Sequence, residues 1–270
     1  MSAPASTTAT ATRPPTPAPP PPAPRDGAFR DVGTVRHANI HAQRYRLQGT
    51  AKVTGEVDAS ELRVEGILSV GGTLTADRVD SRGTLEVART VRVAESFRTR
   101  GTARLAAGLF ARSATTDGQL EVTEGVEVAQ IFSMRGAVEI GRDLTSGLFA
   151  PNGRFAIGGV LRAKEIAGKF DGNSRVDRIE AKTVSLAPRQ LVRLPVDVPI
   201  LRPTSTLQVD RIEAESVEIE GAEVHYLRAD RIVLGRHCHV TRLEGTVVRI
   251  DRSSYVGYES RSAPPYGLTR

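Results

Sequence analysis

The sequence has little of what most proteins use to build a large core or a covalent framework. It has no tryptophan and only 4% aromatic residues, so the core must be built from small aliphatic side chains. Its single cysteine excludes an internal disulfide framework and is typical of a reducing compartment. No apolar run approaches the ~18 residues of a membrane span, and the N-terminus lacks the charged and apolar regions of a secretory signal. We therefore expect a soluble cytoplasmic protein.

Positive charge is in excess, but it is not gathered on one continuous face. The formal net charge is +6 and the sequence pI is about 9.9. Residues 1–50 carry six arginines against two aspartates, a surplus of four, and residues 151–200 carry the same surplus, nine basic against five acidic residues. A nucleic-acid-binding protein needs a basic stripe that follows the phosphates. We therefore expect no nucleic-acid partner.

Prolines divide the chain into segments. Nine of the sixteen prolines stand in the first 25 residues among Ala, Thr and Ser, where too little apolar area can be buried to order the chain. A second cluster of four prolines lies between residues 188 and 203. We predict a disordered or polyproline-like leader (1–29), a first ordered block (30–186), a connector (187–206), a second ordered block (207–256) and a disordered tail (257–270).

A repeat of 17 or 18 residues runs through the first block. Four columns, at four residues before and two, four and eight residues after a repeated glycine, are apolar in all seven units, which makes 28 positions. Positions two and four alternate with polar residues, as in a short strand with one buried face. The glycines that mark the units are Gly49, Gly66, Gly83, Gly101, Gly118, Gly136 and Gly153.

This repeat is too short for a strand–helix unit and predicts stacked strands. We expect an all-β fold, a parallel β-helix with three short strands in each coil of about 17 residues and glycine at a corner. The motif Asp-Arg-apolar recurs at Asp177, near the end of the first block, and at Asp210 and Asp230 in the second, echoing Asp77. We interpret these pairs as exposed charge ladders between coils. Some eleven coils would make a rod about 50 Å long.

Enzymes built on similar repeats need residues that this chain lacks. Left-handed β-helix acyltransferases and gamma-type carbonic anhydrases place histidines on their coils as a base or as zinc ligands, whereas no histidine occurs between Gly49 and Leu186. A lyase-like cleft with clustered aspartates and a glycine-rich phosphate loop are also missing from the sequence. We therefore expect no catalytic residues and no cofactor, with a left-handed β-helix enzyme as the less favoured alternative.

One group of potential metal ligands stands in the second block. In His237-Cys238-His239, a strand would place both imidazoles on one face and the thiol on the other. With His225 nearby, a surface metal site is conceivable. We favour the interpretation that Cys238 points inward, in step with Val240, and that the histidines are solvated, so no metal is expected.

The repeat units, such as Val-Glu-Gly-Ile-Leu-Ser-Val-Gly-Gly-Thr-Leu at residues 64–74, resemble those of the bactofilins, a bacterial family of polymer-forming cytoskeletal proteins. The resemblance covers about residues 47–256, and Val209–Val240 is similar to the longer, two-block branch. It implies a right-handed β-helix, nucleotide-independent filaments and a scaffold for cell-envelope or morphogenetic proteins. The family's short membrane-contacting motif has no counterpart in Met1–Pro4, so contact with the inner face of the membrane is left open.

The two ends of a β-helix carry unpaired backbone groups over an apolar interior, so they must be capped or stacked on another rod. We expect end-to-end assembly of this chain with itself, and the alternative is a capped β-helical adaptor that does not polymerise. The alternative gains support if residues 28–44 fold over the first coil. The candidate end residues are Ile40, Tyr45 and Leu47 at the N-terminal end and Val248, Ile250, Tyr255 and Val256 at the C-terminal end.

Overall fold

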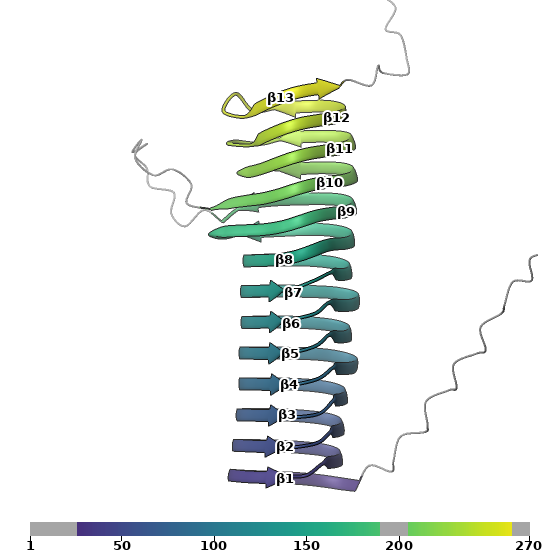
Figure 1. The fold of residues 1–270 in the computed structure, drawn as a ribbon, viewed down its shortest axis with the longest axis vertical. Helices are drawn as coiled ribbons and strands as arrows, with labels where there is room; N and C mark the ends of the chain where they lie inside the picture. The colour runs from purple at the N-terminus through teal and green to yellow at the C-terminus, as the bar shows by residue number, and fades with distance from the viewer. Residues whose placement is uncertain (1–25, 190–204, 261–270) are drawn as a thin grey trace, which may run out of the picture.

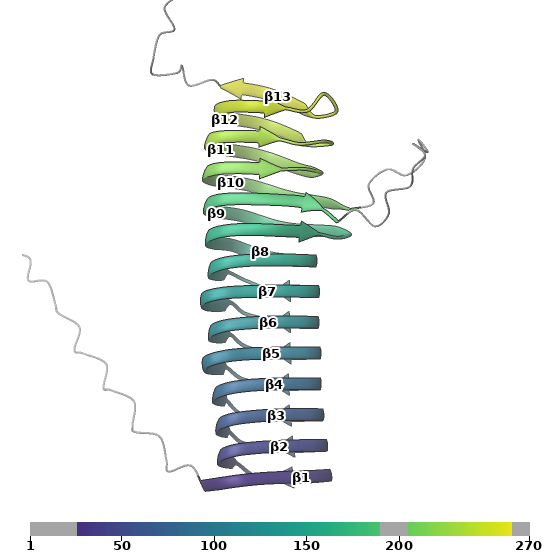
Figure 2. The same cartoon turned by 180° about the vertical axis from the view of Figure 1, so that it is seen from behind.

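The computed structural model describes residues 26–189 and 205–260, which wind into a stack of parallel strands (Figures 1 and 2). The strands form one sheet in which each pairs only with its neighbours along the chain, and no helix occurs in the described ranges. The strands are β1 (Asp26–His37), β2 (Ile40–Val53), β3 (Val57–Val70), β4 (Leu74–Val87), β5 (Val91–Leu105), β6 (Leu109–Val122), β7 (Val126–Ile140), β8 (Leu144–Phe170), β9 (Asn173–Pro188), β10 (Thr206–Ile219), β11 (Ala222–Leu234), β12 (His239–Ile250) and β13 (Tyr255–Ser260).

The four apolar columns of the repeat face the interior. None of their 28 side chains is more than 3% exposed. The columns stack in register, as where Tyr45 pairs with Leu62 and Leu62 with Val79, each step spanning one coil of 17 residues. No coil could bury its inner face alone, so neighbouring coils supply the stability. The prediction of an all-β parallel β-helix is confirmed, with thirteen strands in place of some eleven coils.

Each coil has three inward-facing segments. Along β2 the alternation of buried and exposed side chains breaks twice, once after Ala42 and once around Gly49. The ladder to β3 nevertheless continues through both breaks. The three short strands that the repeat predicts are therefore three segments of one strand of 14 residues. In β2 the inward pairs are Ile40 and Ala42, Tyr45 and Leu47, and Ala51 and Val53.

Two inward columns escape a search for apolar repeats. The column ten residues after the glycine is rich in alanine, for example Ala59 and Ala76. The column two residues before the glycine changes from aliphatic residues to Ser81, Thr99 and Thr116, which stack on successive coils and are fully buried. The hydroxyls of these three residues make no hydrogen bond within the described structure. Two of the six inward columns therefore contain small or hydroxyl-bearing residues alongside larger apolar ones.

The repeated glycine is required by the backbone and by its neighbours. Gly66 has φ 137°, a conformation that side-chain-bearing residues rarely adopt. A Cβ at Gly66 would lie 2.0 Å from the carbonyl oxygen of Gly49 in the coil below. Because glycine lies above glycine, the chains at this corner stack without a side chain between them.

After Gly153, the position in the coil at which one strand ends and the next begins shifts to the glycine corner. In the earlier coils the strand ends elsewhere, as at residues 141–143 between β7 and β8. β8 instead runs unbroken past the equivalent position and ends at Phe170, before a turn in which Gly172 has φ 54°. β9 ends at this same corner, at Pro188, and β10 begins there, at Thr206.

The two predicted blocks form one continuous stack. β9 and β10 pair in register, Val176 with Val209 and Ile179 with Ile212. The Ser205 hydroxyl donates a hydrogen bond of 3.3 Å to the Asp171 carboxylate where the chain returns to the stack. Of the predicted connector, residues 190–204 lie outside the described residues. The described strands also extend past the predicted block limits, because β1 begins at Asp26 and β13 ends at Ser260.

Candidate functional site

The N-terminal end of the rod is formed by β1, one coil before the first predicted end residues. β1 pairs with β2 so that Phe29 lies on Tyr45 and Asp31 on Leu47. As a result Tyr45 and Leu47 are buried, and Ile40, at the start of β2, is buried as well. The expectation that these three form the exposed end is wrong, because all three are buried and β1 adds a coil before them. β1 is hard to recognise in the sequence, because Asp31 and His37 interrupt its inward apolar columns.

Asp31, His37 and Tyr45 form a polar cluster at this end of the core. His37 Nε2 lies 2.6 Å from Asp31 Oδ2, and the Tyr45 hydroxyl donates a hydrogen bond of 2.8 Å to the same oxygen. Burial raises the pKa of the Tyr45 hydroxyl, and the hydrogen bond to Asp31 adds to this effect. At the N-terminal end of the core, the cluster therefore places polar groups that hydrogen-bond to one another. The equivalent positions in other coils carry mainly aliphatic side chains.

The C-terminal end is formed by β13 and the second half of β12. β13 covers only the first half of β12, from His239 to Glu244. In the described part of the chain no strand lies over the rest of β12, where Val248 and Ile250 are exposed. Tyr255 is also exposed, and Val256 packs against the edge of the core. The structure thus places all four C-terminal candidates, Val248, Ile250, Tyr255 and Val256, on the last coil.

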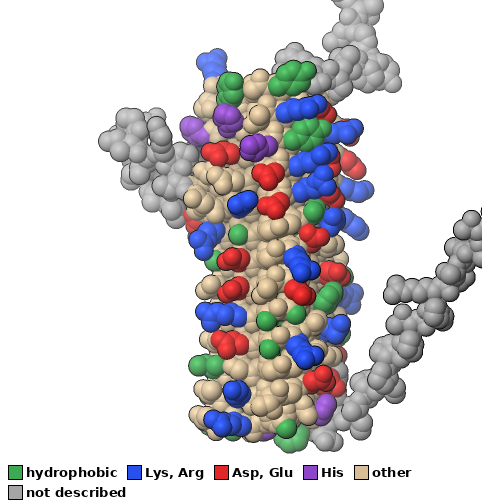
Figure 3. All heavy atoms as spheres, in the orientation of Figure 1, with side chains coloured by type: hydrophobic (Ala, Val, Ile, Leu, Met, Phe, Trp, Pro, Cys, Tyr) green, Lys and Arg blue, Asp and Glu red, His purple; other side chains and the backbone are tan. Residues whose placement is uncertain are grey.

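Exposed large apolar side chains concentrate at the two ends of the rod. Of nine such residues in the described ranges, six belong to β1, β12 and β13, and Figure 3 shows hydrophobic side chains at the foot and at the top of the rod. Sequence reasoning missed three of the six, because Phe29 continues the column of Tyr45 one coil before the first recognised unit, while Val32 and Tyr258 stand outside the columns. The six are Phe29, Val32, Val248, Ile250, Tyr255 and Tyr258; the others are Ile67, Phe110 and Ile131.

A column of stacked arginine and tyrosine side chains leads to the C-terminal end. The Tyr226 ring lies between the guanidinium groups of Arg211 and Arg242, 4.8 and 5.6 Å from its centroid. Its hydroxyl donates a hydrogen bond of 2.6 Å to Glu244 and thereby lowers the pKa of that carboxyl. The column ends at Tyr258, which pairs with Arg242 in register and is exposed. Tyr258 thus belongs to the terminal surface, although it is absent from the predicted set.

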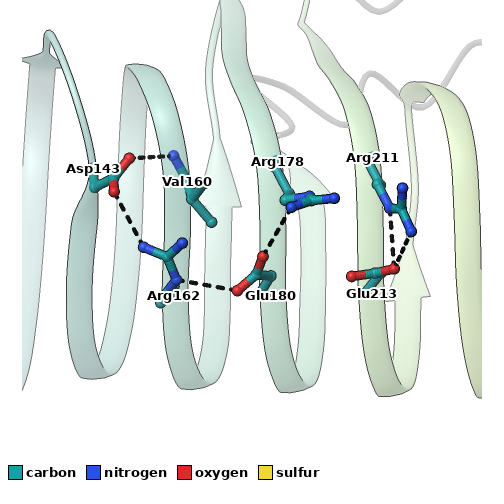
Figure 4. A network of polar contacts seen from close by, with 7 residues as sticks. All are labelled: Asp143, Val160, Arg162, Arg178, Glu180, Arg211 and Glu213. Atoms are coloured by element: carbon teal, nitrogen blue, oxygen red, sulfur yellow. Dashed lines mark hydrogen bonds and ion pairs between the residues drawn. The ribbon is translucent and has the colours of Figure 1, made fainter. Parts of the chain in front are cut away.

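Charged side chains link coils along the outside of the rod (Figure 4). Arg162 bridges two coils, with Asp143 Oδ2 3.1 Å from Nη1 and Glu180 Oε2 3.1 Å from Nε. The arginines of the Asp-Arg motifs differ from one another, because Arg78 pairs with Glu95 on the next coil, as the charge-ladder interpretation expects, whereas Arg178 and Arg211 do not. Arg178 pairs at 3.3 Å with Glu180 on its own strand, and Arg211 pairs in the same way with the glutamate two residues on. In these two motifs the predicted contact between coils is replaced by a contact within one coil.

The histidine–cysteine segment does not form the predicted strand face. His237 lies in a turn with φ 56°, so it does not share a strand face with His239. Cys238 points inward and is buried, as expected, and burial raises the pKa of its thiol. His225 and His239 instead line a shallow groove beside Glu223. Within residues 26–189 and 205–260, no group of three or more His, Cys, Asp or Glu side chains could hold a metal ion.

Among the described residues, no helix is long and apolar enough to cross a membrane. Scans with protein-family models and searches of curated proteins and of solved structures find no match to this chain. The surfaces at the two ends of the rod are therefore the candidate functional sites, on the ground of their geometry and exposure.

Proposed function

We propose that this chain is a non-enzymatic scaffold protein that assembles with itself end to end, through its terminal coils and without a nucleotide or metal. The observation that carries the proposal is the concentration of exposed apolar side chains on β1, β12 and β13. Outside these strands, the described surface exposes only three large apolar side chains along ten strands. A surface of this kind is typical of a site that is covered by a partner.

The backbone at both ends favours the same interpretation. β1 and β13 each have one neighbour in the sheet, so their other edges carry backbone donors and acceptors that a further strand can satisfy. Stacking a second copy would bury Ile250 and its neighbours as well as pair these edges. Each large apolar side chain that passes from full exposure to full burial contributes roughly 1.5–3 kcal/mol.

The resemblance to bactofilins supplies the cellular part of the proposal. The chain would act in the cytoplasm or at the inner face of the membrane and organise cell-envelope or morphogenetic proteins. A rigid rod with a repeated outer face is suited to holding such partners at fixed spacing.

The test is negative-stain electron microscopy and sedimentation of the purified chain without nucleotide or metal. We expect filaments for the wild type and short rods of about 58 Å for Ile250→Arg, the length of thirteen strands at the usual spacing. The matched control is Ile67→Arg, since Ile67 is 45% exposed on the side of the rod and Ile250 is 37% exposed at its end. Filaments in the Ile250 variant, or none in the wild type, would contradict the proposal.

A capped adaptor that does not polymerise is the second candidate, and two observations favour it. Residues 26–37 fold over the first coil, and the Asp31–His37–Tyr45 cluster places polar groups at the N-terminal end of the core. Burying such a cluster against the apolar end of another rod would remove it from water, which is unfavourable. Monodisperse wild-type rods of about 58 Å under all conditions would support this candidate.

A further inference from the structure

A long apolar groove runs along one side of the rod, away from both ends. It has a volume of about 960 Å³ and crosses the coils from β4 to β8. It is lined by small and aliphatic residues, including Ala94, Ala129 and Gly147, and by Phe110. Charged residues such as Arg92 and Arg112 also line it. The exposed surface of the groove is mainly apolar, and the groove is open to solvent.

The groove follows the corner at which the coils are irregular. The pairing between successive coils slips here, as between Val93 and Ser96 and between Val128 and Ile131. Small residues at this corner leave a hollow that larger side chains would fill. Phe110 borders it with 38% of its surface exposed, although Arg92 lies over its ring at 5.7 Å. An exposed aromatic side chain beside a small-residue floor is suited to receive a narrow, rigid apolar segment.

The chain enters the rod at the foot of this same corner. Asp26, the first described residue, is the first member of an in-register column that passes through Ala76 and reaches Ser146 in the groove. This column contains seven steps, and at ~4.8 Å each they place Ser146 about 34 Å from the coil of Asp26. A segment that precedes Asp26 can therefore follow the column without crossing another face of the rod.

We propose that the proline-rich segment Pro14–Pro24 of the same chain binds in this groove as a polyproline II helix. The segment has eleven residues, of which eight are proline, and Arg25 alone separates it from Asp26. At ~3.1 Å per residue, eleven residues of polyproline II span about 34 Å, which equals the height from Asp26 to Ser146, so the half of the segment farther from Asp26 would lie along β4–β8. Proline-rich segments lose little conformational entropy on binding, and grooves with exposed aromatic side chains bind them in other proteins.

The inference is independent of the proposed assembly. The groove lies on β4–β8, whereas the end surfaces lie on β1, β12 and β13. A leader bound along the side would shield Phe110 and leave both ends accessible. It would also give the proline-rich segment a defined place on the outside of the rod.

The experiment uses the full chain with a photoreactive p-benzoyl-phenylalanine in place of Phe110. After irradiation and proteolysis, mass spectrometry locates the adducts. We expect them within residues 14–24, at a yield at least tenfold above that from the same amino acid in place of Ile67, which is similarly exposed on another face (45% against 38%). Equal yields at the two positions, or adducts outside the leader, would overturn the proposal.

Two further measurements separate the binding modes. In a mixture of ¹⁵N-labelled and unlabelled protein, a leader bound to its own rod gives adducts of a single isotope. Adducts of mixed isotope would assign the groove to a second copy's leader and overturn the proposal as stated. Ala129→Arg places a long side chain in the groove, so this variant should lose the adduct at Phe110 while keeping the circular-dichroism spectrum of the wild type. Retention of the adduct would also count against the proposal.

Discussion

At the scale of single residues, the column of buried hydroxyls departs most clearly from the expected interior. Ser81, Thr99 and Thr116 are fully buried on three successive coils, and their hydroxyls make no hydrogen bond within the described structure. A buried hydroxyl without a partner destabilises a fold by roughly 1–3 kcal/mol. These hydroxyls therefore lower the stability of the middle of the rod, although the side chains that carry them are fully buried.

Thr99→Val should stabilise the rod, because valine keeps the shape of threonine and removes the unpaired hydroxyl. We expect an increase of about 1 kcal/mol in the free energy of unfolding, measured as a higher urea midpoint. Thr145→Val on the outer face of β8 is the control and should change the midpoint little, since Thr145 is exposed. A lower midpoint for the Thr99 variant would mean that its hydroxyl is satisfied inside the rod.

The columns show how far single residues could be predicted from the sequence. Four columns were predictable because every member is apolar, and their burial is confirmed. The other two were not, because alanine and hydroxyl-bearing residues such as Ala59 and Thr99 are equally common on surfaces. His237 was placed on a strand because its turn depends on a positive φ, which histidine adopts rarely and without a sequence signal.

At the scale of elements, the corner glycine couples each coil to the next. Gly101 has φ 125°, and a Cβ there would lie 2.3 Å from the carbonyl oxygen of Gly83. Both the strained backbone and the contact would have to be relieved by separating the coils, since the obstacle is backbone and not a flexible side chain. The effect of a substitution should therefore spread to the neighbouring coils.

Gly101→Ala should lower the free energy of unfolding by more than about 2 kcal/mol, combining backbone strain with overpacking. Amide hydrogen exchange should become faster in β4, β5 and β6 and stay unchanged in β10 and β11. Gly27→Ala is the control, because a Cβ at Gly27 meets nothing within 4 Å and its φ is not positive. Uniform acceleration along the whole rod would contradict the idea that coupling is between neighbours.

The terminal elements were the least predictable part of the candidate site. The C-terminal candidates are on the last coil, where Ile250 and Val256 continue inward apolar columns, whereas Tyr255 continues the outward column of His239. At the N-terminal end the prediction missed one coil, because Asp31 and His37 occupy inward positions that the pattern reserves for apolar residues. A search for apolar columns cannot find β1, because polar residues replace apolar ones in two of its inward positions. The backbone of β1 nevertheless pairs in register with β2.

At the scale of the whole molecule, the two ends of the rod differ in chemistry. The core at the C-terminal end is closed by aliphatic residues such as Val256, whereas the N-terminal end presents the Asp31–His37–Tyr45 cluster. The two ends of the rod are therefore not equivalent, and we expect them to associate with different strength. The N-terminal end should limit growth, because its polar groups lose water when another rod covers them.

Replacing the cluster by the residues of the neighbouring coils tests this limit. Asp31→Leu combined with His37→Val continues the two apolar columns to the end of the rod, so we expect a larger sedimenting fraction and longer filaments at the same protein concentration. The double variant removes the Asp31 partner of the buried Tyr45 hydroxyl, so filament lengths are compared only if its circular-dichroism spectrum matches that of the wild type. His41→Val is the control, since His41 is exposed on the next coil and its loss removes a histidine from the same end. An unchanged length distribution in the double variant would show that the cluster does not limit assembly, and shorter filaments would indicate that it forms part of the contact between rods.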